Sequence, residues 1–299
     1  MRLRALVLLL VACRCFGDTN TFTIATYNVQ NWVLMERKGT ANAPKPDTEQ
    51  KAVVNVLAVV KPDVLAVQEM GTSHELAELR RALKAHGFDY PHTEWIQGED
   101  PTRHVALLSR FPIIERLSHT NDTYQLDGQP KRVSRGILDV RVQVNPQYSF
   151  RVLVAHLKSK RQTDDGDQAV IRLEEARLLR RHVDEILKAD PHENVVVMGD
   201  LNDTYGSDAI REVSTGLFVL RPRDSKGYDT THFWKAKREF SRLDYLMLSP
   251  GMRSELVTGT PRIADPPRWL DGSDHRAVSA TFYMQDMGTN RPAHPTTTP

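Results

Sequence analysis

The chain carries the stretch VVVMGDLN at residues 195–202, in which four consecutive apolar residues lead into a polar turn. A short apolar run of this kind is typical of a strand that is buried on both faces. The same arrangement recurs at 64–69, where an apolar run ends at Gln68-Glu69, and polar groups gather again in Ser273-Asp274-His275. Polar residues at the ends of buried strands are in a position to meet a ligand, so these three places are candidate parts of one site.

Strand-like and helix-like segments alternate in the first part of the chain, whereas later strands follow one another without helices between them. This order favours a mixed α/β sandwich over a doubly wound parallel sheet. No shift in composition divides residues 18–285, which we interpret as a single domain. We expect helices at 47–60, 72–85 and 169–189, strands at 21–29, 64–67, 104–109, 136–144, 150–157, 195–198, 243–248 and 277–283, and long loops at 30–47, 111–134, 158–168 and 221–240.

Residues 1–17 differ from the rest of the chain. A basic start is followed by a short apolar run and by small residues, which is typical of an export signal and too short for a membrane anchor. The run ending at Cys13 resembles a lipobox, so lipid anchoring is an alternative to simple secretion. Both interpretations predict an exported protein, periplasmic or extracellular. Residues 286–299 are rich in Pro and Thr and are expected to be disordered, and no stretch of the body predicts a transmembrane helix.

Cleavage after Gly17 would change both the cysteine count and the charge. The two cysteines, Cys13 and Cys15, lie in the signal, so the mature chain would have no disulfide, zinc–thiolate site or cysteine nucleophile. The full chain has 40 Lys and Arg against 38 Asp and Glu, and removing the signal takes away three arginines and leaves 37 against 38. Such a protein is no global polycation, so any attraction to nucleic acid must come from a local patch.

The three polar pieces at strand ends supply carboxylate and amide oxygens together with an imidazole. Hard oxygen ligands of this kind suit Mg²⁺ or Mn²⁺. A divalent cation neutralises the negative charge that develops when a phosphate ester is hydrolysed. The residues therefore indicate a metal-dependent site that acts on phosphate esters.

Seven short motifs together cover nearly all of residues 22–283. They are Thr26-Tyr27-Asn28, Gln68-Glu69, Ser134-Arg135-Gly136, His156-Leu157-Lys158, Gly199-Asp200-Leu201-Asn202, Leu243-Asp244-Tyr245 and Ser273-Asp274-His275. These motifs resemble those of the endonuclease/exonuclease/phosphatase superfamily, whose deoxyribonuclease-like members are metal-dependent phosphoesterases. The resemblance implies an α+β fold, a four-layer α/β sandwich in which two mixed β-sheets pack together with helices outside. It also implies Mg²⁺ or Mn²⁺ as the cofactor, with Ca²⁺ as a structural or supporting ion.

The resemblance assigns the metal to Glu69, with the amide oxygen of Asn28 in support and Asp274 as a carboxylate on the metal side. Taken singly, these residues have plainer interpretations. A glutamate is most often solvated and paired with a surface lysine. An asparagine after a strand is often only a turn residue. The metal assignment therefore depends on the complete set of motifs.

The remaining motifs are assigned to the chemical step. Asp200 is expected to orient or deprotonate the attacking water, and Asn202 to hold a phosphate oxygen. His275 is assigned to phosphate binding and water activation, and His156 to transition-state charge or the leaving group. Asp244 is expected to orient His275, because a carboxylate behind an imidazole fixes its tautomer and raises its basicity. Which histidine donates the proton stays open.

Arg135, Lys158 and Asn31 are the expected substrate contacts. A guanidinium suits bidentate binding of phosphate, and Lys158 begins a basic run that would extend along a polyanion, although such runs are often only solvated loops. Deoxyribonuclease-like members also carry a glutamate behind the counterpart of His156. Residues 101–104 offer no such carboxylate, which leaves Glu99 or Asp100 as the remaining candidates.

The leading hypothesis is an exported, metal-dependent nuclease that hydrolyses DNA or RNA. The alternative keeps the chemistry but acts on a phospholipid, as a sphingomyelinase-like phosphodiesterase does, or on a small phosphomonoester. A lipid substrate requires an exposed apolar loop, for which 31–35 is the candidate; its other interpretation is a cleft wall or a buried packing strip. A third hypothesis is a binding module without catalysis, which the complete set of motifs disfavours. A monomer is the default oligomeric state.

Overall fold

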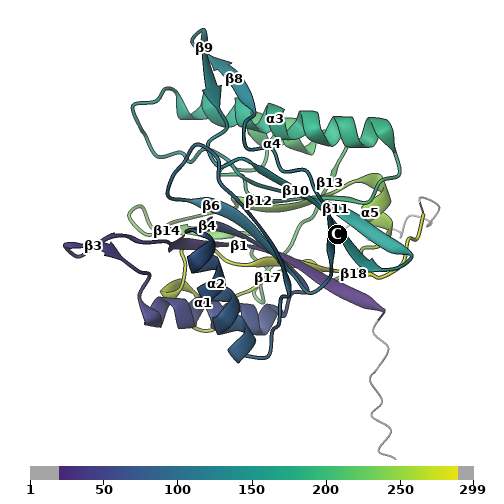
Figure 1. Ribbon diagram of the computed structural model, residues 1–299, viewed down its shortest axis with the longest axis horizontal. Helices are drawn as coiled ribbons and strands as arrows, with labels where there is room; N and C mark the ends of the chain where they lie inside the picture. The colour runs from purple at the N-terminus through teal and green to yellow at the C-terminus, as the bar shows by residue number, and fades with distance from the viewer. Residues whose placement is uncertain (1–19, 289–299) are drawn as a thin grey trace, which may run out of the picture.

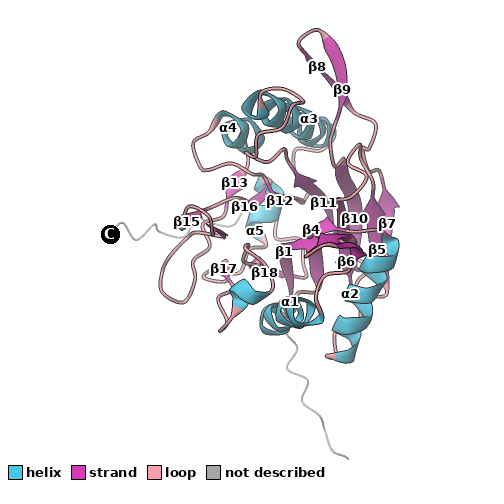
Figure 2. Cartoon of the chain, turned by 90° about the vertical axis from the view of Figure 1, so that its left-hand side faces the viewer, coloured by secondary structure: helices cyan, strands magenta, loops and turns pink. Residues whose placement is uncertain are grey.

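The computed structural model describes residues 20–288, which form two packed β-sheets with helices on their outer faces (Figure 1). The predicted export signal and residues 289–299 of the predicted tail lie outside this range. Figure 2 shows the layers in turn, with α3 and α4 on one side of the two sheets and α1 and α2 on the other. The predicted sandwich of two mixed sheets is confirmed. The helices are α1 (Asp47–Val60), α2 (Ser73–Ala85), α3 (Gln168–Ala189), α4 (Asp208–Ser214) and α5 (Pro250–Ser254), with a 3₁₀ helix at Trp269–Asp271.

Each sheet has six strands and contains one parallel pair. The parallel pairs, β1–β4 and β11–β12, are each joined through a helix, α1 or α3, because parallel neighbours need a crossover connection. The first sheet has the order β17 (Arg262–Ile263), β18 (Val278–Tyr283), β1 (Thr21–Trp32), β4 (Val64–Met70), β6 (His104–Ser109) and β5 (His92–Ile96). The second has the order β13 (Phe218–Val219), β16 (Asp244–Leu248), β12 (Val195–Asp200), β11 (Tyr148–His156), β10 (Ile137–Asn145) and β7 (Ile113–Arg116).

Three apolar layers hold the four structural layers together. Side chains alternate along each strand, so Val196 and Met198 of β12 face the core between the sheets, whereas Val195 and Val197 pack beneath α3. The first sheet has the same division, with its outer side chains packed against α1 and α2. Burial on both faces explains why β12 is apolar throughout and does not alternate with polar residues.

The helix ends follow from their sequences. A capping box begins α2, in which Glu75 Oε2 accepts a hydrogen bond from Thr72 N at 2.7 Å while Thr72 Oγ1 accepts one from His74 N at 3.2 Å. The Asp167 side chain caps the start of α3 by accepting hydrogen bonds from two backbone amides of its first turn. Among the described residues, no helix combines the length and the apolar character needed to cross a bilayer.

The predicted loops are wrong in part. Three of them contain short antiparallel ribbons whose side chains are mostly exposed, so no alternation of apolar and polar residues marks them in the sequence. The loop before α3 is confirmed as far as Asp167. The ribbons are β2 (Met35–Arg37) with β3 (Thr40–Ala43), β8 (Thr123–Leu126) with β9 (Gln129–Arg132), and β14 (His232–Trp234) with β15 (Glu239–Ser241).

The glycine before Asp200 is required by the packing of β12 against β11. Gly199 has φ +139°, and a Cβ atom there would lie 1.9 Å from Ala155 O. We therefore expect Gly199→Ala to lower the free energy of unfolding by more than about 3 kcal/mol. Gly206→Ala is the matched control, since Gly206 also has positive φ, +89°, but its Cβ would meet no atom within 4 Å. Denaturant unfolding that shows equal losses for both variants would contradict this account.

Candidate active site

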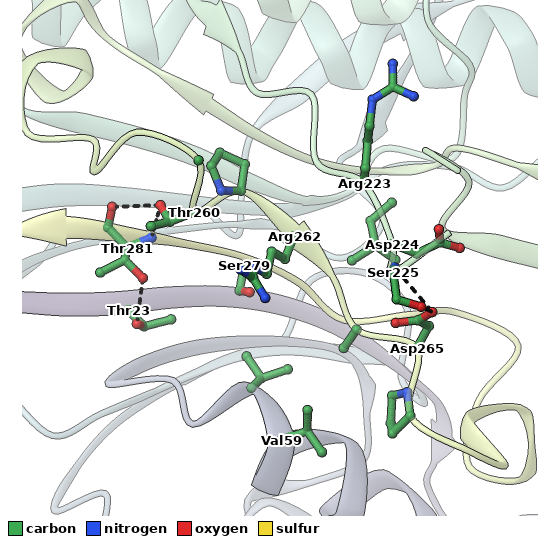
Figure 3. Close-up of a pocket in the computed structure, with 16 residues that line it drawn as sticks. Thr23, Val59, Arg223, Asp224, Ser225, Thr260, Arg262, Asp265, Ser279 and Thr281 are labelled. Atoms are coloured by element: carbon green, nitrogen blue, oxygen red, sulfur yellow. Dashed lines mark hydrogen bonds between the residues drawn. The ribbon is translucent and has the colours of Figure 1, made fainter. Parts of the chain in front are cut away.

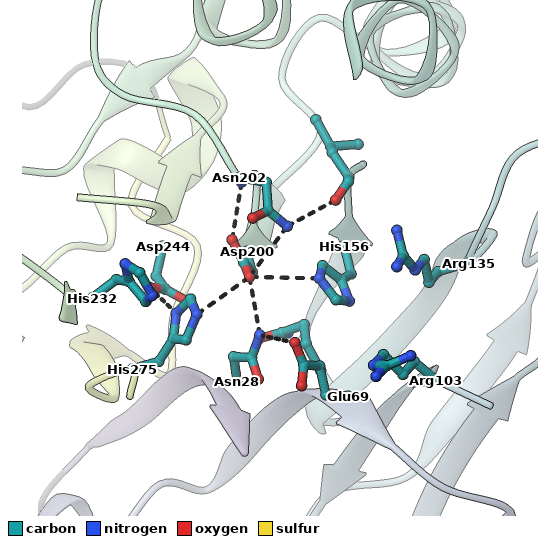
Figure 4. Close-up of polar contacts among 12 residues, drawn as sticks. Asn28, Glu69, Arg103, Arg135, His156, Asp200, Asn202, His232, Asp244 and His275 are labelled. Atoms are coloured by element: carbon teal, nitrogen blue, oxygen red, sulfur yellow. Dashed lines mark hydrogen bonds and ion pairs between the residues drawn. The ribbon is translucent and has the colours of Figure 1, made fainter. Parts of the chain in front are cut away.

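The predicted site residues meet at one edge of the core between the sheets. Asn28, Asp200 and His156 continue the series of inward-facing positions on β1, β12 and β11 beyond the last apolar side chain. Asp244 lies directly across from Asp200 in the β12–β16 pair. The same side-chain alternation that builds the apolar core therefore brings polar groups from both sheets into one cluster (Figure 4).

Glu69 reaches this cluster through an irregular strand end. Its φ is +59°, and the pairing register of β4 shifts between Gln68 and Met70. Its carboxylate accepts hydrogen bonds from Asn31 N at 2.8 Å and from Asn28 Nδ2 at 3.3 Å. A left-handed conformation is unusual for glutamate and is often found where a functional side chain is re-aimed.

Asp200 is the centre of the cluster and is 1% exposed. Its Oδ2 lies 3.0 Å from Asn28 Nδ2, 3.5 Å from His156 Nε2 and 3.7 Å from His275 Nε2 (Figure 4). Its Oδ1 accepts a hydrogen bond from Asn202 N at 2.9 Å. Burial, assisted by the nearby Asp244 carboxylate, raises the pKa of Asp200 against the opposing effect of His275. A basic carboxylate between two imidazoles is suited to accepting a proton.

His275 and Asp244 form the predicted pair. His275 Nδ1 lies 2.9 Å from Asp244 Oδ2, which leaves Nε2 directed at Asp200. Burial alone would lower the pKa of His275, but the carboxylates of Asp244 and Asp200 outweigh it and hold that pKa well above 6.5. His275 is therefore a cationic hydrogen-bond donor at neutral pH.

His156 is held in a different state. Burial, followed by the charges of Arg135 and His275, lowers the pKa of His156 well below 6.5. Its Nδ1 is buried and has no hydrogen-bond partner among the described residues. The suggestion that Asp100 stands behind His156 is wrong, since the Asp100 carboxylate lies 3.3 Å from Arg135 Nε and accepts hydrogen bonds from the Thr102 and Arg103 backbones. The surroundings thus shift the two histidines in opposite directions, His275 toward the cationic form and His156 toward the neutral one.

The expected substrate contacts lie on the His156 side of the cluster. Arg135 is 8% exposed and is directed toward the site (Figure 4). Lys158 Nζ pairs with Asp165 at 2.5 Å, so its ammonium group is already neutralised. Asn31 Oδ1 accepts a hydrogen bond from Arg103 Nε at 2.8 Å. Direct contact of these residues with substrate stays a prediction.

The sequence pattern of the endonuclease/exonuclease/phosphatase family matches residues 25–275. The chain belongs to this family. No curated protein matches it in sequence.

Similar solved structures share the fold at low sequence identity. The human Nocturnin catalytic domain with bound sulfate has a TM-score of 0.61 and 16% identity, covering 88% of this chain and 94% of that one. Truncated TDP2 from Caenorhabditis elegans has a TM-score of 0.59 and 19% identity, with coverage of 88% and 97%. Sphingomyelinase C from Streptomyces griseocarneus has a TM-score of 0.59 and 19% identity, with coverage of 88% and 99%. Such identities show the fold alone.

Enzymes of this family generally use divalent metals, and the acidic groups of this site fit such an ion. The carboxylates of Glu69 and Asp200 are both held by the Asn28 amide, which places two hard oxygen ligands side by side. Asn28 Oδ1 itself accepts a hydrogen bond from Gln30 N at 2.9 Å, so in this arrangement the amide aligns the carboxylates. Asp274 lies near His232 and His275, with donor atoms of the three residues within 4.8 Å of one another. The metal roles of Glu69, Asn28 and Asp274 stay predictions.

Four contributors to the site were not predicted from the sequence. His232 packs against the His275 ring with 4.6 Å between centroids, and burial lowers the pKa of His232 to about 4. Gln30 Oε1 accepts a hydrogen bond from Asp274 N at 3.0 Å. Glu175 of α3 and Arg103 of the loop before β6 complete the set. None of the four directly follows an apolar run, as Asp200 does, and none lies at a position that the family resemblance assigned to the site.

A cavity of about 820 Å³ lies elsewhere, along β17 and β18 at the edge of the first sheet (Figure 3). Thr23, Arg262, Asp265 and Thr281 are among its lining residues. No predicted site residue of the described chain lines it. The candidate active site is therefore defined by the converging polar groups and not by the size of this cavity.

Asp244→Asn tests the cause of the raised pKa of His275. Losing the carboxylate charge destabilises the imidazolium, so the pKa of His275 should fall, as followed by NMR titration of its ring protons. In the wild type the stabilisation from a raised pKa is complete below 6.5 and disappears as pH rises through the folded-state pKa. The stability difference between the two proteins should therefore shrink at alkaline pH. An unchanged His275 titration in the folded variant would refute this cause.

Glu175→Gln tests a positioning role. The buried Glu175 carboxylate accepts hydrogen bonds from Ser134 N at 3.0 Å and from Lys158 N at 2.6 Å, and so joins the two segments that carry Arg135 and His156. The amide keeps only one acceptor oxygen, so we expect KM to rise with a loss of about 1–3 kcal/mol in stability. Glu174→Gln is the control, because Glu174 pairs only with the exposed Arg177 in the observed contacts. Equal kinetics for both variants would contradict the role.

Proposed function

Within the phosphoester hydrolases of this family, we propose that this protein is an exported divalent-metal-dependent phosphodiesterase, and specifically a nuclease that hydrolyses DNA or RNA. The observation that carries the proposal is the buried Asp200 carboxylate, whose Oδ2 lies 3.5 Å from His156 Nε2 and 3.7 Å from His275 Nε2, with a nearly buried arginine at the same site. Export rests on the sequence of residues 1–17.

Each polar residue of the site has a separate role in the proposed reaction, which follows from its position. Asp200, whose pKa is raised by burial, accepts the proton of the attacking water. The imidazolium of His275 donates to a non-bridging phosphate oxygen and keeps its proton on the Asp244 side. Asn202 N donates to Asp200, and its Nδ2 donates to Leu157 O at 2.9 Å, so Asn202 mainly fixes Asp200. A bound divalent cation would supply charge neutralisation for the phosphoryl group.

His156 is the neutral member and lies beside the arginine. A neutral imidazole donates one hydrogen bond to an oxygen on which negative charge develops, and the departing alkoxide then takes its proton from solvent. This supports a position for His156 next to the leaving-group oxygen, which agrees with its expected role in stabilising transition-state charge or the leaving group. The proposed division of work between the two histidines rests on their opposite pKa shifts.

A phospholipid is the second candidate substrate, but the 31–35 segment is not the exposed apolar loop that such a substrate requires. The 31–35 segment offers little apolar surface, because Trp32 is 1% and Val33 is 2% exposed, which leaves Leu34 as its one largely exposed apolar side chain. The ribbon β14–β15 does expose Trp234 at 45% and Phe240 at 53%. Lys237 lies over the Trp234 ring, and aromatic side chains beside lysines bind either nucleic-acid bases or a lipid headgroup region. The substrate must therefore be tested directly.

The decisive assay compares magnesium-dependent turnover of plasmid DNA, structured RNA and sphingomyelin vesicles by the mature protein. We expect nucleic-acid cleavage that stops with chelator and falls at least ~10²-fold in Asp200→Asn and in His275→Ala. The control is Asp208→Asn, which makes the same change at an exposed aspartate that pairs with Arg211 outside the site. Turnover of sphingomyelin without nucleic-acid cleavage would overturn the nuclease proposal in favour of the lipid substrate.

A further inference from the structure

Two guanidinium groups lie together on the His156 side of the site (Figure 4). Arg135 enters from the segment before β10, and Arg103 from the residue before β6. Both contribute to lowering the pKa of His156, which agrees with their proximity to its ring. The family resemblance leads one to expect a carboxylate behind this histidine, and in this chain the neighbouring groups are cations.

The Nε and Nη1 donors of Arg135 have no acceptor among the described residues. Arg135 is 8% exposed, and its Nε and Nη1 atoms are buried without a hydrogen-bond partner among the described residues. Asp100 Oδ2 lies 3.3 Å from Arg135 Nε and forms an ion pair with it. The geometry of this contact is not that of a hydrogen bond, so Nε has no acceptor. Burying a charged group with unmet donors is costly, so such a group is usually completed by a ligand.

Arg103 is fixed relative to the acidic side of the site. Its Nε donates to Asn31 Oδ1 at 2.8 Å, and Asn31 N donates to Glu69 Oε2 at 2.8 Å. These two hydrogen bonds fix the position of the Arg103 guanidinium relative to the Glu69 carboxylate, which is predicted to bind the metal. The terminal nitrogens of Arg103 form no bond in the observed contacts of the described chain, so they are available to an anion.

We infer that Arg103 and Arg135 form a subsite for a second phosphate group, adjacent to the phosphate that is hydrolysed. Each planar guanidinium can give two parallel hydrogen bonds to phosphate oxygens, so the pair offers more directed donors than one arginine alone. Two carboxylates act on Arg135: Asp100, whose Oδ2 lies 3.3 Å from Nε, and the buried Glu175. The unused guanidinium donors favour a substrate chain with successive phosphates. This inference rests on the proposed function.

Binding of small nucleotides tests the subsite without requiring turnover. The probes are thymidine 5′-monophosphate and thymidine 3′,5′-bisphosphate, titrated by calorimetry into the mature protein with magnesium, with the nucleotides checked for integrity afterwards. We expect the bisphosphate to bind about tenfold to a hundredfold more tightly, the usual effect of charge-assisted hydrogen bonds. Arg103→Gln and Arg135→Gln should each reduce this preference to within about threefold.

The control is Arg110→Gln, which removes the same charge just beyond the far end of β6, where Arg110 pairs with Asp63 at 2.6 Å. It should keep the wild-type preference. If Arg135→Gln fails to fold, as judged by circular dichroism, the more exposed Arg103→Gln carries the test. Equal binding of both nucleotides by the wild type, or an unchanged preference in the folded Arg103→Gln protein, would overturn the subsite.

Assays of DNA cleavage on the wild type and these variants distinguish failure of the phosphate subsite from failure of the nuclease proposal. DNA cleavage without a bisphosphate preference would leave the nuclease standing and remove the subsite. A bisphosphate preference that depends on Arg103, in a protein that cleaves no nucleic acid, would support the subsite and reject the nuclease. Loss of both would reject both.

Discussion

The burial of one carboxylate at the edge of the core between the sheets is the constraint on which the site depends. Asp200 is almost without contact with water, and a buried charge is tolerated only when hydrogen bonds and opposite charges surround it. Asn28 and the Asn202 backbone supply the hydrogen bonds, and His275 supplies the positive charge. Asp244 in turn stabilises the charged form of His275, so the state of each group depends on its neighbour.

This arrangement requires rigid backbone positions, and the sheets provide them. Gln30, Asn31, Glu69 and Asn202 all have positive φ although none is glycine. Such conformations persist only where the surrounding structure determines them. Gln30, Asn31 and Glu69 lie within the last three residues of β1 or β4, and Asn202 lies two residues beyond β12. Each of these strands is paired on both sides, so the regular part of the sheet fixes these irregular positions.

The site also separates its charges. Glu69 and Asp200 are joined by Asn28 and suit a divalent cation, while Arg103 and Arg135 lie on the His156 side (Figure 4). The two sides are linked through Asn31, which contacts both Glu69 and Arg103. A phosphodiester chain crossing the site would meet a cation at the reacting phosphate and guanidinium groups at its neighbour. Since the mature chain would be nearly neutral overall, this local asymmetry matters more than net charge.

The sequence by itself determined the sandwich and most of the site, because apolar runs followed by polar residues mark both the buried strands and the groups at their ends. Glu69 and Asp200 follow such runs, whereas the family resemblance assigned Asn28 and His275, and the four residues do converge. Only the tertiary structure decided which partner each side chain takes. Asp100 pairs with Arg135 and not with His156, and Glu175 reaches the site from an outer helix. Such contacts join residues far apart in the chain, and no local pattern of hydrophobicity records a hydrogen bond that forms only when distant segments pack together.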